Sequence, residues 1–193
     1  MTETQIVYPD PFFNNAEELF GWDVGMAGDY AVVGVPGMLT GQPGYAVVLL
    51  YSENEWTKVA TLTSSDQDIS DMFGFSVDIS GNCIVVGTGT FEDMNKNKGG
   101  AAYLFVKPES GWKDMVQTAK LYASDGQNSD RFGYSVGISN DCVIVGAYGD
   151  NHNGEYCGSA YVFEKPEDNW HDMFQTAKLV ASDGQAGDFF GCS

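Results

Sequence analysis

A Phe-Gly pair followed by a short alternating segment recurs at a nearly constant spacing along this chain of 193 residues. Phe-Gly-Phe-Ser-Val-Asp-Ile-Ser at 73–80 reappears as Phe-Gly-Tyr-Ser-Val-Gly-Ile-Ser at 132–139. A looser copy begins at Phe20, a fourth Phe-Gly begins at Phe190, and the pairs are 53, 59 and 58 residues apart. A fixed period of this size is typical of proteins in which one supersecondary unit stacks on the next. The sequence therefore predicts a repeat architecture.

Each unit contains four strand signals, which are clearest in the last unit. Residues 132–138 alternate, with Phe132, Tyr134, Val136 and Ile138 on one side and Gly or Ser on the other, which is the period of a strand. Residues 142–145 form a continuous apolar run, which predicts a strand buried on both faces. Two further strands are expected at 158–163 and 177–180, separated by a polar turn that ends in a tryptophan. These patterns predict an all-β fold.

Four antiparallel strands joined by short turns, repeated at equal size, favour the blades of a β-propeller. The expected blades are 20–72 (blade 1), 73–131 (blade 2) and 132–189 (blade 3). Residues 1–19 are expected to be the outer strand of a preceding blade plus a linker, and 190–193 the start of a further blade.

Propellers close with about four to eight blades, so three blades predict an incomplete ring. Two ways to complete it stay open. A second copy could close a six-bladed dimer, or the chain could be a segment of a longer polypeptide. The Phe-Gly at 190–191 favours the longer polypeptide.

These residues resemble the FG-GAP repeat, the blade unit of the integrin-α-like β-propeller. The Phe-Gly pairs match the "FG" of that repeat, and its "GAP" position reads Gly-Ala-Tyr at 146–148, Gly-Thr-Gly at 87–89 and Gly-Val-Pro at 34–36. The resemblance implies a non-catalytic, adhesion-type binding protein. It also implies an extracellular or cell-surface location, although 1–5 show no signal peptide and the location stays open.

Calcium is the cofactor that the resemblance brings into question. Many FG-GAP repeats carry an Asp-rich calcium loop between the first and second strands, but here those positions hold Ser-Gly-Asn at 80–82 and Ser-Asn-Asp at 139–141. Calcium takes six to eight oxygen ligands, so loops this short predict no cofactor. The nearest substitute is a loop of blade 3 with oxygen donors at Asp150, Asn151, Asn153 and Glu155. An Asn- and Gly-rich turn that bonds to itself is the favoured alternative.

The net charge of −18, from 27 acidic and 9 basic residues, excludes nucleic acid as an expected partner. Strand order places two sets of loops on one rim: those from fourth to first strands, and those from second to third strands. This acidic rim is expected to bind a protein or glycan through Asp66, Asp71, Asp93, Asp125, Asp130, Asp150, Glu155, Asp183 and Asp188. Several of these acids recur with the repeat, which favours a turn-capping role. The other interpretation is a surface that recruits a basic partner or divalent cations.

Catalytic signatures are missing from the sequence. Neither His152 nor His171 has a nucleophile near it in sequence, and there is no Cys-x-x-Cys, His-Glu-x-x-His or phosphate-binding loop. No apolar run is long enough to span a membrane, so no membrane insertion is expected. The chain is therefore not expected to be an enzyme.

The tryptophans and cysteines are assigned from their positions in the repeat. The tryptophans at 56, 112 and 170 recur in the turn before the fourth strand, which favours blade packing over stacking on sugars, and Trp22 is expected in the core. The cysteines at 83 and 142 are expected to be small buried apolar residues. Cys157 and Cys192 are the expected reactive thiols.

Together these observations predict a non-catalytic binding or adhesion-type module that presents its acidic rim to a protein or glycan. The alternative is a structural subunit that docks through open blade edges, because an unpaired sheet edge is a template for association. Further blades, from the same longer chain or from a second copy, are partners in either case.

Overall fold

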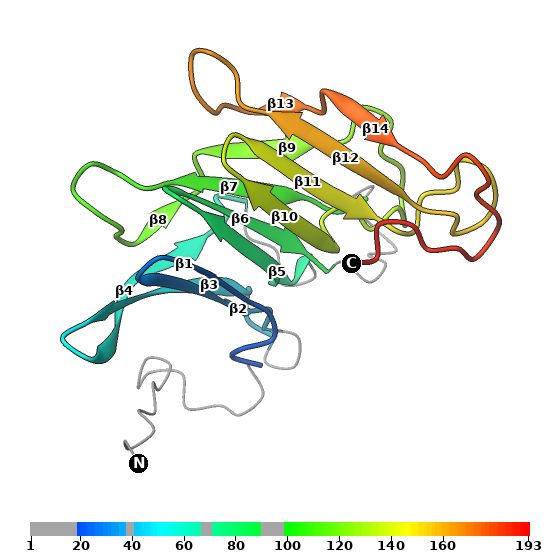
Figure 1. The fold of residues 1–193 in the computed structure, drawn as a ribbon. Helices are drawn as coiled ribbons and strands as arrows, with labels where there is room; N and C mark the ends of the chain where they lie inside the picture. Colours follow the sequence, from blue (N-terminus) through cyan, green and yellow to red (C-terminus); the bar gives the residue numbers. More distant parts are fainter. Residues whose placement is uncertain (1–18, 38–40, 67–70, 90–98) are drawn as a thin grey trace.

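The computed structural model describes residues 19–37, 41–66, 71–89 and 99–193. Within these ranges the chain is all-β and contains no α-helix, and three twisted sheets stand side by side without closing into a ring (Figure 1). The predicted class, about three propeller blades, is confirmed. The strand expected within 1–19 falls outside the described residues, except for Leu19. None of the described segments is a helix long and apolar enough to cross a membrane.

Each blade is a meander of four antiparallel strands. Blade 1 consists of β1 (Val24–Ala27), β2 (Tyr30–Val35), β3 (Tyr45–Ser52) and β4 (Glu55–Thr63). Blade 2 consists of β5 (Phe73–Ser80), β6 (Cys83–Thr88), β7 (Ala102–Val106) and β9 (Ala119–Tyr122). Blade 3 consists of β10 (Ser135–Ser139), β11 (Cys142–Ala147), β12 (Ser159–Glu164) and β14 (Ala177–Leu179).

Two short strands cross from one blade to the sheet before it. β8 (Met115–Val116) belongs to blade 2 in sequence but pairs in parallel with β4 of blade 1. β13 (Met173–Phe174) of blade 3 pairs in the same way with β9 of blade 2. The repeat pattern predicts only a turn in these segments, so the crossing strands are a feature that sequence reasoning missed.

Side chains from adjacent blades form two apolar cores. The first joins blade 1 to blade 2, with Val48 and Leu62 packed against Phe73, Tyr103 and other residues of blade 2. The second joins blade 2 to blade 3 through the corresponding positions. Trp112 and Trp170 are 7% and 4% exposed and close the two cores at one end, as the repeat predicts. Stability therefore lies mainly between blades, because one sheet alone cannot cover its own faces.

The Phe-Gly pair forms a turn that carries each blade onto the one before it. Gly133 has a φ of 92°, and the residue two positions earlier, Arg131, has a φ of 58°. This turn brings the carbonyl of Gly133 against Gly87 of blade 2, where an added Cβ would lie 2.0 Å from that oxygen. Gly34 against Gly74, and Gly146 against Gly191, repeat the contact. The glycines of the repeat are therefore needed for close approach between neighbouring blades.

The same turn corrects the expected start of the first strand. In blade 3 the pairing of β10 with β11 begins at Ser135, not at Phe132, and the amide of Tyr134 donates to the Arg131 carbonyl across the turn. In blade 2 the strand does begin at Phe73, but its register shifts between Phe73 and Ser76. A left-handed glycine cannot continue an extended alternating strand, so alternation alone placed the strand too early.

The second strand is buried on both faces in blade 2 but not in blade 3. Ile84 and Val85, on opposite faces of β6, are both fully buried, as expected. In β11 the side chain of Ile144 is 42% exposed and Cys142 is also exposed. The expectation is wrong for blade 3 because, in the described part of the chain, no further blade covers its outer face.

Three single-residue expectations are also wrong. Trp22 is 46% exposed instead of lying in the core, although its ring packs against Phe75. Cys83 is only half-buried. Cys157 is buried rather than exposed as a reactive loop thiol, with its Sγ bonded to the Asp150 carbonyl. The solvent exposure of each of these positions depends on which neighbour covers it, which the repeat pattern does not show.

Candidate functional site

The candidate site is the acidic rim, and strand order places its loops together as the sequence predicts. In Figure 1 the loop from the second to the third strand of blade 3 and the linker after its fourth strand lie at the right. The turns between first and second strands and between third and fourth strands lie at the left, on the opposite rim. The described loops and linkers that carry the predicted acids therefore share one end of the blade stack.

At the junction of blades 1 and 2, Asp66 is bound by two side chains of blade 2. The Tyr103 hydroxyl donates to Asp66 Oδ1 at 2.9 Å, and the Lys120 ammonium lies 2.6 Å from Asp66 Oδ2. Burial on its own would raise the pKa of the Asp66 carboxyl, but these hydrogen bonds outweigh it and hold the pKa below its ordinary value. Asp66 is therefore part of the contact between blades.

The junction of blades 2 and 3 repeats this arrangement and adds a second carboxylate. Lys178 Nζ lies 2.6 Å from both Asp125 Oδ2 and Asp150 Oδ2. The Tyr161 hydroxyl is 3.1 Å from Asp125 Oδ1 and 2.9 Å from Asp150 Oδ2, and its single proton serves one of them at a time. Against the opposing effect of burial, the ammonium lowers the pKa of both carboxyls. The two acids neutralise a cation that the blade itself supplies.

Two further rim acids, Asp71 and Asp130, are buried, at 7% and 5% exposed. Asp130 Oδ2 accepts the amide of Gln127 at 2.7 Å, which is the capped turn that the repeated acids predict. Burial, together with repulsion from Asp150, raises the pKa of Asp130 to about 6. This carboxyl is therefore placed to stabilise the linker and not to meet a partner.

The remaining predicted acids divide into two groups. Glu155, Asp183 and Asp188 are exposed, at the blade 3 end of the rim. Asp93 lies outside the described residues. The described residues of this set lie at one rim. Most of them are either buried or bound by lysine and tyrosine side chains of the same chain.

The candidate cation ligands of blade 3 are partly engaged within their own loop. Asp150 is held by Lys178, and Asn151 Oδ1 accepts the amide of Tyr156 at 2.8 Å. Asn153 and Glu155 are exposed, and the Asn153 amide donates to Cys157 Sγ. No group of three or more His, Cys, Asp or Glu side chains gathers around a metal-sized space among the residues that the structure places. These bonds are those of the self-bonded turn, and a cation there stays a prediction.

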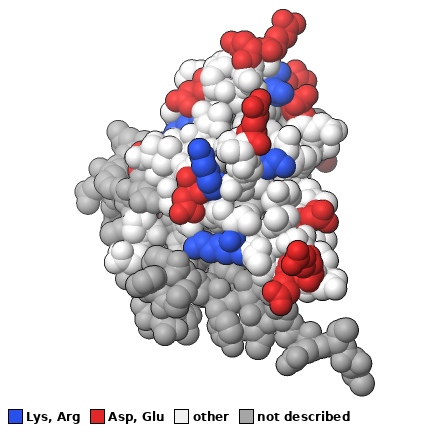
Figure 2. All heavy atoms as spheres, turned by 90° about the vertical axis from the view of Figure 1, so that its left-hand side faces the viewer, with Lys and Arg blue, Asp and Glu red and all other residues white. Residues whose placement is uncertain are grey.

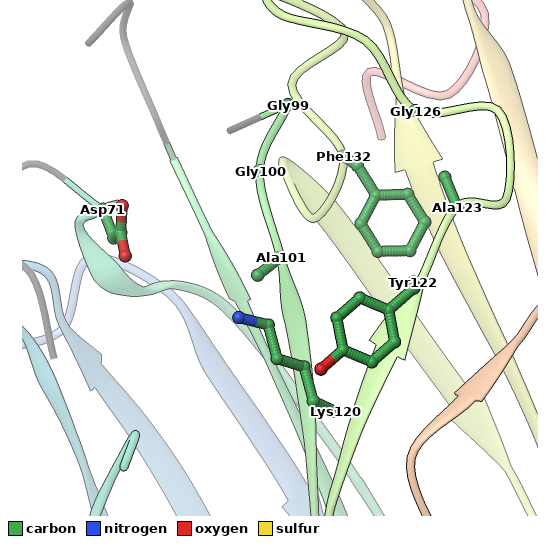
Figure 3. A pocket seen from close by; sticks show the side chains of 9 residues that line it. All are labelled: Asp71, Gly99, Gly100, Ala101, Lys120, Tyr122, Ala123, Gly126 and Phe132. Carbon is green, nitrogen blue, oxygen red and sulfur yellow. The ribbon is translucent and has the colours of Figure 1, made fainter. Parts of the chain in front are cut away.

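A pocket of about 230 Å³ opens on this rim between blades 2 and 3. In Figure 3, Lys120 and Tyr122 project from β9, the Phe132 ring lies beside Ala123, and Asp71 lies on the far side of the Lys120 ammonium. The volume is below the roughly 300–1,000 Å³ that is typical of small-molecule sites. The pocket is therefore smaller than a typical small-molecule site.

An aromatic row lines a second, more open groove of about 480 Å³ beside the first strands. The rings of Trp22, Phe75 and Tyr134 stand in sequence, with centroids 5.2 Å and 4.8 Å apart. All three occupy the position after Phe-Gly, one in each blade. The recurrence of an aromatic residue at one repeat position was the signal that could have identified this row.

The opposite rim carries exposed side chains of both signs. Figure 2 looks at that end of the molecule, where blue and red side chains are interspersed. Its turns carry Lys107, Lys113 and Lys165 among acidic residues, and Lys165 lies 3.4 Å from Asp141. Side chains of both signs therefore lie close together on the opposite rim.

Comparison with known protein families gives one match, the FG-GAP repeat, at residues 56–105, 115–163 and 173–193. No curated protein matches the chain. The matched segments cover more than half of the chain and contain the Phe-Gly turns at Phe73 and Phe132 that carry each blade onto the one before. By its repeats and its three stacked blades, the chain belongs to the FG-GAP repeat family.

Proposed function

We propose that this chain is a non-catalytic binding module whose acidic rim engages a basic surface of a protein partner. FG-GAP repeats are generally binding or adhesion-type modules, and propellers built from them are typically non-enzymatic. A protein is favoured over a glycan as the partner because lysine and arginine side chains supply the opposite charge. Complementary charge of this kind increases association rates and excludes wrong partners.

The observation that supports the proposal is how the charged side chains of the acidic rim are engaged. The basic side chains described on the acidic rim are directed at their own chain: Lys120 and Lys178 at linker carboxylates, and Arg131 over the Tyr148 ring at 4.9 Å. Exposed Glu155 and Asp188 then carry negative charge without a described basic partner. A surface of one sign attracts oppositely charged partners over a Debye length, roughly 8–10 Å in physiological salt.

The aromatic row supplies an apolar anchor next to this charge. Trp22, Phe75 and Tyr134 line the open groove together with Asp23. Large aromatic side chains are enriched among the residues that carry most of the binding energy in protein interfaces. A partner segment that combines basic and apolar side chains fits both features.

The test compares equal charge changes on the two rims. Asp125 and Asp150 are unsuitable targets, because they hold the blade 2–blade 3 junction. The rim variant is Glu155→Lys with Asp188→Lys, and its matched control is Glu167→Lys with Asp168→Lys in an exposed turn of the opposite rim. Titration calorimetry with a ten-residue oligolysine peptide, at low and physiological salt, measures binding.

We expect the rim variant to bind roughly tenfold more weakly and the control to stay within about twofold of the unmodified chain. Equal weakening in both variants would mean that only net charge matters. Unmodified protein that fails to bind the peptide at low salt would overturn the proposal. Trp22→Ala adds a second arm, in which affinity for a peptide alternating Lys and Phe falls while affinity for oligolysine does not.

A second candidate function, a structural subunit that docks through open blades, is favoured by one observation. Apolar side chains are exposed on the outer face of blade 3, with Ile144 at 42% and Leu179 at 41%. Monomeric surfaces carry single exposed apolar side chains routinely, but a sheet face of them marks an interaction site.

A further inference from the structure

Each inter-blade junction is fastened by an Asp and a Gln from the crossing segment, which we call the clamp. In blade 2 the clamp is Asp114 and Gln117: Asp114 Oδ1 accepts the Thr61 amide at 2.7 Å, and Gln117 both accepts from the Ser65 amide and donates to Ser65 Oγ. Between them, β8 pairs with the end of β4. The clamp thus satisfies main-chain amides along the outer edge of blade 1.

The clamp of blade 3 repeats these contacts on blade 2. Asp172 Oδ1 accepts the Lys120 amide at 2.8 Å, and Gln175 bonds both the amide and the hydroxyl of Ser124, at 2.9 Å and 2.8 Å. The sequence Trp-x-Asp-Met-x-Gln-Thr-Ala-Lys, at 112–120 and 170–178, carries the clamp in both blades. Two independent junctions therefore define what covers the outer edge of a blade.

The outer face of blade 2 is closed as a result. Val85, Leu104 and Leu121 are fully buried in the core shared with blade 3. Phe132, which enters from the linker, is 2% exposed and packs against Tyr161 with ring centroids 5.3 Å apart. Each of these contacts requires the next blade.

The outer face of blade 3 carries the equivalent residues, but no described blade covers them. Ile144 and Leu179, which correspond to Val85 and Leu121, are 42% and 41% exposed. Among the described residues, no side chain accepts from the amides of Lys178 and Ser182, which correspond to those of Lys120 and Ser124. Phe190, the counterpart of Phe132, is 38% exposed.

Blade 1 of a second copy does not supply the missing clamp. The third and fourth strands of blade 1 are joined by a tight hairpin in which Ser52 pairs with Glu55, so blade 1 has no crossing segment equivalent to residues 107–118. Val47 also pairs with Thr61 where Tyr103 pairs with Lys120, so the Tyr and Lys that hold the linker carboxylate are missing as well.

We propose that the outer face of blade 3 is the docking surface for a further FG-GAP blade that carries the Asp–Gln clamp, and not for blade 1 of a second copy. The Asp binds the Lys178 amide, the Gln binds Ser182, and the blade's Tyr and Lys take Asp183 as Tyr161 and Lys178 take Asp125. This inference names the partner of the second candidate function and is independent of binding at the acidic rim.

The first test asks whether the clamp protects a blade edge in the unmodified architecture. Replacing Asp172 and Gln175 by Ala should make hydrogen exchange at the Lys120 and Ser124 amides at least roughly tenfold faster, because each loses its acceptor. Asp168→Ala with His171→Ala, exposed in the same segment, is the matched control. Unchanged exchange at Lys120 and Ser124 would show that the clamp does not bind the edge and would overturn the proposal.

The second test supplies the missing blade. Ser193 corresponds to Ser135, so a second copy of residues 136–193 is appended directly after it. The Lys178 and Ser182 amides should then slow at least roughly tenfold, and should return to fast exchange when the appended Asp and Gln are replaced by Ala. If both amides still exchange fast when the extra blade is present, the proposal is contradicted. This holds whether or not the appended blade is folded, because the same sequence already folds as blade 3.

A third measurement tests whether a second copy of the chain covers this face. Exchange at the Lys178 and Ser182 amides in the unmodified chain is measured at low and high protein concentration, with sedimentation in parallel. We expect no concentration dependence at these two amides. Protection that grows with dimer formation would assign this face to self-association and overturn the proposal. The oligolysine titration is read separately, so either idea can fail alone.

Discussion

The two linkers Ala-Ser-Asp-Gly-Gln, at 123–127 and 181–185, have identical sequences but different surroundings. Asp125 in the first accepts hydrogen bonds from Tyr161 and Lys178 of blade 3. Asp183 in the second is exposed, with no described blade beyond it. The comparison shows that an acid of the FG-GAP linker becomes an interface residue when the next blade is present.

The same comparison extends to the residues that follow each linker. Phe132 is buried in the blade 2–blade 3 core, whereas Phe190 is 38% exposed. Asp130 is buried and Asp188 is exposed, although each caps the same turn through the amide three residues before it. Four predictions on matched positions test whether the two linkers differ in this way.

The largest difference is expected at the phenylalanines. Phe132→Ala should reduce the free energy of unfolding by about 3–5 kcal/mol, because it leaves a cavity beside Tyr161 and Phe163. Phe190→Ala should cost less than about 1 kcal/mol, because its ring is already partly in solvent. Urea unfolding followed by circular dichroism measures both. Similar costs at the two positions would contradict the assignment of Phe132 to an inter-blade core.

The linker carboxylates should give the next largest difference. Asp125→Ala removes acceptors from Lys178 and Tyr161, and because Asp150 still binds both, the expected loss is about 1–2 kcal/mol. Asp183→Ala should be within about 0.5 kcal/mol of the unmodified chain. The same unfolding experiment applies. A larger effect at Asp183 than at Asp125 would mean that the second linker is also engaged.

The hydrogen-exchange rates of main-chain amides allow the two blade edges to be compared without any substitution. The Lys120 amide, which donates to Asp172, should exchange at least roughly tenfold more slowly than the Lys178 amide, for which the described residues provide no side-chain acceptor. Amide-resolved hydrogen exchange by NMR provides the measurement. Equal protection would show that the outer edge of blade 3 is covered in solution.

The smallest effect is a pH dependence at Asp130. Its pKa is raised from 3.8 to about 6 by burial, so the folded chain holds this proton more tightly than the unfolded chain. Its contribution to stability is therefore fully present below about pH 4 and is lost as the pH rises through about 6, by on the order of 1 kcal/mol. Asp130→Asn should abolish that decline, whereas Asp188→Asn should retain it. Unfolding curves from pH 4 to 7 decide between these outcomes.

The repeat, the all-β class and the order of strands could be predicted from the sequence alone. The 53–59-residue period, the glycine at each Phe-Gly turn and the buried second strand of blade 2 are local signals that any stacked blade must carry. The sequence also placed the acids on one rim, because strand order alone decides which loops share an end. It gave no signal that residues 115–116 and 173–174 would pair with the preceding blade.

The role of each repeated residue depends on its tertiary contacts. Asp125 and Asp183, or Val85 and Ile144, are equivalent in sequence, and their exposure differs because the neighbour that covers one is not described for the other. Trp22 is exposed for the same kind of reason, since a first-strand aromatic residue is buried only between neighbours. Burial and ion pairing in stacked blades are set by contacts more than 50 residues apart in sequence, such as that of Lys178 with Asp125, and a local pattern carries no information about them.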